Sequence, residues 1–119
     1  MRIDRAKALK AFDDYVKKYD IKDEKIRLKI EHTYRVCELC EKIALSLKLN
    51  KSEIDIAWLT GLLHDVGRFE QVKRYGTFND SKSIDHAELS SEILFKDGNI
   101  RDFIYDKSED DLIKIVIES

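Results

Sequence analysis

The chain has few residues at which a helix must stop. It has no proline and only four glycines among 119 residues, and these two residue types are the strongest local breakers of regular structure. Apolar residues recur at three- and four-residue spacing and seldom alternate with polar ones, which is typical of amphipathic helices. We therefore predict an all-α fold, a bundle of about five or six helices, in a chain long enough for a single core.

The hydrophobic spacing also predicts where the helices lie. Asn50 and Glu53 form a predicted capping box before the third helix, Gly98 is a candidate for a helix C-terminal glycine, and Ser108 is a candidate N-cap. We expect the third helix to fray at Gly67, where glycine lets the chain turn away. Residues 69–85 are expected to form a helical tail and then a polar loop. The predicted helices span residues 3–19, 24–47, 51–67, 85–95 and 109–118, with a short segment at 100–105.

The charges nearly balance, which argues against some classes of function. The chain has 24 acidic and 22 basic residues and a net charge of -2, so it lacks the overall basic field of a protein that binds nucleic acid non-specifically. No stretch approaches the roughly 18 apolar residues of a membrane span, and the N-terminus lacks the apolar core of a signal peptide. We expect a soluble cytoplasmic protein with no membrane partner.

Cys37 and Cys40 form a C-x-x-C pattern, which in other contexts is a redox pair or half of a zinc site. Here both cysteines lie inside a predicted helix, on its apolar seam, and the chain has no second such pair. We interpret them as small buried hydrophobic residues.

His64 and Asp65 are adjacent near the end of the predicted third helix. Asp65 follows Trp58 by seven residues and Leu62 by three, so a continuing helix would turn its carboxylate toward the core. A buried carboxylate must be neutralised, paired or bound to a metal, and imidazole with carboxylate is a ligand set for first-row metals. The alternative is structural: Asp65 caps or pairs with a neighbouring helix, and His64 is a hydrogen-bonded core histidine.

These residues, together with His32 on the preceding predicted helix, resemble the HD superfamily of metal-dependent phosphohydrolases, whose pattern is H…HD…D. Segment 31–36 (EHTYRV) is similar to the first motif of the superfamily, and segment 62–71 (LLHDVGRFEQ) to its second. Segments 75–80 and 84–87 are similar to a bacterial branch of small HD proteins with loosely defined substrates.

The resemblance implies a role for each candidate residue and a helical bundle of the HD type. One or more divalent metal ions, chosen among manganese, iron, cobalt, nickel, zinc and magnesium, would activate a water toward a phosphate ester. The implied substrate is a small phosphorylated molecule, for which a nucleotide is one candidate. The implied metal ligands are His32, His64, Asp65 and His86, the last of which is alternatively a substrate contact; the catalytic residues are Asp65 and Arg68, and the substrate contacts are Arg35, Arg68, Gln71 and Asp80.

The chain departs from the family pattern at its C-terminal end. The closing aspartate of the pattern is expected after Ser119, because Asp106, Asp110 and Asp111 all come too early. We therefore expect residues 1–119 to form one HD-type domain that is incomplete at its C-terminal end, which leaves the activity of this chain open.

Two other classes of function remain alternatives. If the metal site is incomplete, the chain is a non-catalytic helical module that binds a ligand or partner. An iron oxygenase on the same scaffold is a third hypothesis. Within the superfamily, two subfamilies resemble the chain less well. The guanosine-tetraphosphate hydrolases carry an acidic pair where this chain has Gly67-Arg68-Phe69-Glu70, and the chain lacks the GYP signature of the cyclic-dinucleotide phosphodiesterases.

Overall fold

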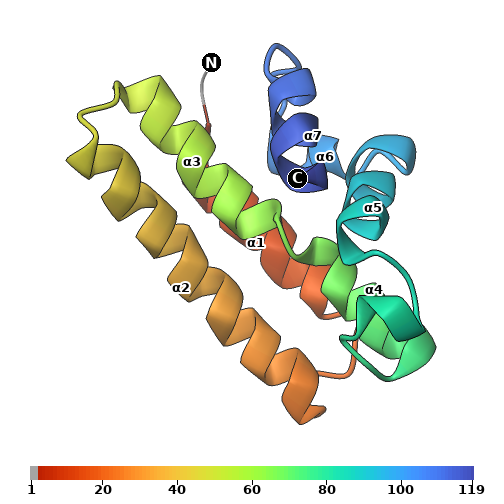
Figure 1. The fold of residues 1–119 in the computed structure, drawn as a ribbon. Helices are drawn as coiled ribbons and strands as arrows, with labels where there is room; N and C mark the ends of the chain where they lie inside the picture. The colour runs from red at the N-terminus through yellow and green to blue at the C-terminus, as the bar shows by residue number, and fades with distance from the viewer. Residues whose placement is uncertain (1–2) are drawn as a thin grey trace.

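A computed structural model describes residues 3–119, and the regular elements in this part of the chain are all helical (Figure 1). This confirms the predicted all-α bundle. A 3₁₀ turn at Asp80–Lys82 lies between α4 and α5, and a π-helical stretch at Glu92–Lys96 extends α5. The α-helices are α1 (Arg5–Val16), α2 (Glu24–Ser46), α3 (Lys51–Leu63), α4 (Val66–Tyr75), α5 (His86–Ser91), α6 (Ile100–Phe103) and α7 (Asp110–Glu118).

The long helices α2 and α3 lie side by side, and α1 passes behind α3 (Figure 1). Gly61 makes this approach possible, because a Cβ at that position would lie 2.9 Å from the Cα of Cys37 on α2. Fully buried side chains of α1, α3, α4 and α6 fill the space between these helices, among them Phe12, Leu62, Phe69 and Phe103. The packing brings the middle of α2 next to the C-terminal end of α3.

Cys37 is 2% exposed, and its thiol donates a hydrogen bond to the carbonyl oxygen of Trp58 at 3.1 Å. Burial is the main cause that raises its pKa to about 12. Cys40 is partly buried, and both thiols are free. These observations fit the interpretation of the pair as packing residues, since a protonated buried thiol is a poor nucleophile and a poor metal ligand.

The predicted end of the third helix is wrong. We expected this helix to fray at Gly67, but α3 ends at Leu63 and α4 begins at Val66, so the break falls on His64 and Asp65. Asp65 adopts φ -114° and ψ 16°, outside the helical region. Gly67 lies inside α4 and packs against α5, so its role is close packing and not a turn.

The predictions for the helix ends have mixed outcomes. The capping box of Asn50 and Glu53 is present in full, with both of its hydrogen bonds, and Gly98 has the positive φ (82°) of a glycine that follows a helix. The N-cap predicted at Ser108 is wrong, because Glu109 precedes the first residue of α7. The backbone N–H of Ser108 instead donates to the Asp106 carboxylate at 2.8 Å, within a turn that delays the helix.

Among residues 3–119, none of the helices combines the length and the apolar character that crossing a membrane requires.

Candidate metal centre

His32, His64 and Asp65 converge from three adjacent segments of the fold. His32 lies on α2, His64 directly follows the last residue of α3, and Asp65 lies in the break before α4. One oxygen of Asp65, Oδ2, lies 3.2 Å from His64 Nε2 and 3.5 Å from His32 Nε2. Each of the three side chains offers one ligand atom, and these atoms lie within 4.8 Å of one another, so the group could hold a metal ion.

His86 approaches the same carboxylate from a third helix. It is the first residue of α5, and its Nε2 lies 3.7 Å from the second oxygen of Asp65, Oδ1. Asp85 caps this helix by accepting a hydrogen bond from the backbone N–H of Ala87 at 2.9 Å. The two carboxylate oxygens of Asp65 therefore face imidazoles from three different helices.

Hydrogen bonding at His64 explains why this arrangement fits a metal ion. His64 Nδ1 lies 2.6 Å from the carbonyl oxygen of Gly61. A carbonyl can only accept, so Nδ1 carries the hydrogen, and in neutral His64 the Nε2 lone pair is directed at the Asp65 carboxylate. Two lone pairs that face each other require a proton or a metal ion between them. Two imidazole nitrogens and a carboxylate oxygen suit first-row divalent ions.

The pKa values of Asp65, His64 and His32 are shifted by burial and because these side chains and Lys29 lie close together. Burial by itself raises the pKa of Asp65, but the pKa is lowered well below the usual range because His64 and Lys29 stabilise the carboxylate. The pKa of His64 is raised although burial opposes this, since the imidazolium would pair with Asp65. Burial and then the charge of Lys29 lower the pKa of His32, which favours the neutral imidazole that a metal needs.

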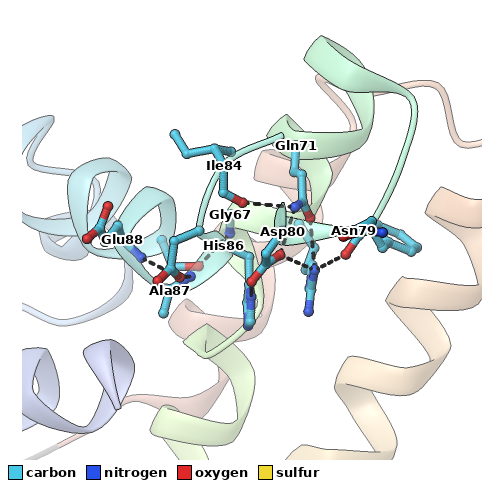
Figure 2. A network of polar contacts seen from close by, with 12 residues as sticks. Gly67, Gln71, Asn79, Asp80, Ile84, His86, Ala87 and Glu88 are labelled. Atoms are coloured by element: carbon cyan, nitrogen blue, oxygen red, sulfur yellow. Dashed lines mark hydrogen bonds and ion pairs between the residues drawn. The ribbon is translucent and has the colours of Figure 1, made fainter. Parts of the chain in front are cut away.

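A polar network holds His86 in its orientation (Figure 2). His86 Nδ1 lies 2.7 Å from Asp80 Oδ2, while Asp80 Oδ1 accepts from Arg68 Nη1 and from Gln71 Nε2, both at 2.9 Å. Gln71 has no exposed surface, and its amide also donates to Ile84 O at 3.1 Å. Burial of Asp80 acts to raise its pKa, but the bonds from His86 and Gln71 lower it to about 2.

Three of the residues predicted to contact substrate have a structural role in this network. Arg68 Nη1 donates to Gln71 Oε1 at 2.9 Å and to the Phe78 carbonyl oxygen at 2.6 Å, in addition to Asp80. Arg68, Gln71 and Asp80 therefore form one unit that supports His86. Direct contact of these three residues with a substrate stays a prediction.

Arg35 and Asp85 lie close in sequence to the candidate ligands His32 and His86. Arg35 is exposed on α2, one turn after His32. Asp80, Asp85 and His86 form a second cluster of possible ligand atoms. The carboxylates of that cluster are already engaged, Asp85 in capping α5 and Asp80 with Arg68 and Gln71.

Sequence reasoning missed Lys29, which lies in the group. Its Nζ is 3.3 Å from Asp65 Oδ2, and its side chain is 16% exposed. The signal was present, because Lys29 precedes His32 by three residues and thus shares a helix face with it. This ion pair is also the structural pairing of Asp65 that was considered as the alternative to a metal.

Comparison with known proteins shows the family of the chain. The chain is similar to the 3'3'-cGAMP-specific phosphodiesterase 1 of Vibrio cholerae serotype O1, with 33% identity over 67 residues; the match covers 53% of this chain and 16% of the relative. No solved structure matches the chain. The family model of the HD domain matches residues 30–119, which include His32, His64, Asp65 and His86. The chain therefore belongs to the HD domain family of metal-dependent hydrolases.

Proposed function

We propose that the chain is a metal-dependent phosphohydrolase that cleaves a phosphate ester of a nucleotide or of another small molecule. The observation that carries the proposal is the convergence of His32 Nε2 and His64 Nε2 on Asp65 Oδ2, at 3.5 and 3.2 Å. In this proposal His32, His64 and Asp65 hold a divalent ion, and His86, 3.7 Å from Asp65 Oδ1, is a further ligand or a substrate contact. A divalent ion in such a site lowers the pKa of a coordinated water toward neutrality and neutralises charge on phosphoryl oxygens.

The protein's own residues prepare this site in three ways. The Gly61 carbonyl selects the His64 tautomer with a free Nε2, through the 2.6 Å contact to Nδ1. Asp80 similarly orients His86 through Nδ1 at 2.7 Å. Arg68, held in place by Asp80, adds a fixed positive charge to the network beside His86, and this charge favours an anionic substrate without a direct contact.

The compounds to test first follow from the comparison with a known protein. The name of the Vibrio cholerae relative assigns that protein a cyclic dinucleotide, and the shared segment is 16% of its length. We therefore propose nucleotides as the first compounds to test, with mononucleotides and 3'3'-cGAMP in the same screen. The exposed Arg35, one turn beyond His32, is the proposed contact for a substrate phosphate outside the metal site.

The experiment is a metal analysis followed by that screen. Protein purified without a metal-affinity step is analysed for first-row metals, beside a variant with both His64→Ala and Asp65→Ala. We expect about one ion per chain or more in the wild type, loss of the ion in the variant, and phosphate-ester hydrolysis that requires the ion. Hydrolysis is measured as phosphate release from mononucleotides and as ring opening of 3'3'-cGAMP to a linear dinucleotide. Stoichiometric metal without turnover of any phosphate ester would contradict the enzymatic proposal and favour the ligand-binding module.

A further inference from the structure

We propose that Lys29 and the metal ion compete for Asp65, and that metal binding releases the Lys29 ammonium to become the phosphate-binding group of the site. This inference rests on the proposed function. The inference is based on the contacts of a single oxygen atom. Asp65 Oδ2 lies 3.3 Å from Lys29 Nζ and is also close to the ring nitrogens of His32 and His64.

Binding of the ion would place two cations on the same oxygen. An ion held by His32 and His64 must use Asp65 Oδ2, because this is the carboxylate oxygen nearest to both imidazoles. The Lys29 ammonium would then face a divalent cation across a buried carboxylate that is only 5% exposed. Like charges repel more strongly at a partly buried site than in bulk water, so the ammonium moves when the ion binds.

The surroundings of Lys29 favour a short movement that keeps the ammonium near the site. Its Nζ lies 5.0 Å from the centre of the Phe78 ring, and an aromatic face stabilises a cation after its carboxylate partner is lost. The flexible stem of lysine lets the ammonium turn without a change in the backbone. A phosphate bound at the ion would offer the ammonium anionic oxygens in exchange for the Asp65 carboxylate.

Arg68, a second partly buried cation of this region, is less free to act in this way. Arg68 Nη1 donates to three acceptors at once, Gln71 Oε1, the Phe78 carbonyl oxygen and Asp80 Oδ1, at 2.6 to 2.9 Å. Lys29 has a single ion pair, at 3.3 Å. Moving Arg68 onto a phosphate would break the network that orients His86, whereas moving Lys29 exchanges one anionic partner for another.

The test measures two binding constants that should change in opposite directions. Calorimetry with Mn²⁺ alone is carried out on metal-free wild type and on Lys29→Met, and then with inorganic phosphate on the Mn²⁺-loaded proteins. We expect Lys29→Met to bind Mn²⁺ about tenfold more tightly and phosphate about tenfold more weakly, as for the loss of a charge-assisted contact. A purely structural Lys29 would weaken both.

Two further variants make the result decisive. Lys29→Gln also removes the charge and should show both shifts, which guards against a folding defect specific to methionine. Lys25→Met removes an exposed lysine one turn earlier on α2 and should change neither constant. Unchanged or weaker Mn²⁺ binding in both Lys29 variants, or unchanged phosphate binding, would overturn the inference. Absence of Mn²⁺ binding in wild type and in both Lys29 variants would instead reject the proposed function, and this inference with it.

Discussion

Gly67 on α4 is in direct contact with Ser90 on α5: its backbone N–H donates to Ser90 Oγ at 2.8 Å, and a Cβ on Gly67 would lie 2.6 Å from the Ser90 backbone nitrogen. The same Cβ would lie 2.7 Å from the carbonyl oxygen of His86. This contact therefore sets the distance between the HD pair, which precedes α4, and His86, which begins α5.

Gly67→Ala should destabilise the protein by about 1–3 kcal/mol, the usual cost of an extra methyl group in a tightly packed site. Two of the three closest atoms belong to the backbone, so a side-chain rotation cannot relieve the clash. The free energy of unfolding, from urea titration, measures the effect. Adding Ser90→Ala should not restore the stability, since it removes only the hydroxyl contact. Full recovery in that double variant would show that the backbone approach is not limiting.

Asp80→Ala should weaken metal binding by about 10- to 100-fold, the range found when a carboxylate that orients a metal-binding histidine is removed. The reason is that His86 loses its 2.7 Å partner at Nδ1, while Arg68 and Gln71 lose their shared acceptor. Mn²⁺ calorimetry measures the affinity. Asp97→Ala, at an exposed position after α5, serves as the control and should bind Mn²⁺ as wild type does. Equal affinity in both variants would argue against His86 as a ligand.

Mn²⁺ should stabilise the folded protein, because the three ligand atoms are brought together only by folding. At about 100 times its dissociation constant, an ion that binds only the folded state adds about 2.7 kcal/mol to the free energy of unfolding. Urea titrations with Mn²⁺ and with a chelator measure the difference. Asp65→Asn removes the charged ligand and should abolish the gain. A gain of the same size in that variant would locate the ion elsewhere.

Tyr15→Phe should lower stability by about 1 kcal/mol near pH 7, the typical value of one hydrogen bond. The Tyr15 hydroxyl donates to the carbonyl oxygen of Val66 at 3.0 Å and so secures the backbone directly after Asp65. Unfolding by urea at pH 7 measures this loss. Tyr75→Phe, at an exposed tyrosine, should have little effect.

The ionisation of Tyr15 should also lower the free energy of unfolding at alkaline pH. Burial raises its pKa to about 12, against about 10 in an unfolded chain. Between these values the unfolded state loses the proton and the folded state keeps it, so the contribution is complete below pH 10 and declines as the pH rises to 12. The decline between pH 10 and 12 should be smaller in Tyr15→Phe. An identical decline in both proteins would assign it to other groups.

Much of the helical structure and part of the candidate site could be predicted from local sequence. The spacing of apolar residues predicted the helix that became α2 within about one residue at each end, and the Asn50–Glu53 capping box was recognised directly. His32, His64 and Asp65 were singled out as a possible metal group from a sequence motif, and they lie together. These features depend on residues that are close in sequence or on a short motif, so one chain is enough to detect them.

Tertiary packing decided the rest. Periodicity did not predict the helix break at His64 and Asp65. The backbone just beyond the break is hydrogen-bonded by the buried Tyr15 of α1, a contact that only tertiary packing creates. Lys29 likewise became a partner of Asp65 only where α2 meets the end of α3. Helical spacing determines which side chains share a face, but the partner that each face meets depends on how closely the helices approach. In this chain that approach is controlled by glycine contacts whose consequences are visible only in three dimensions.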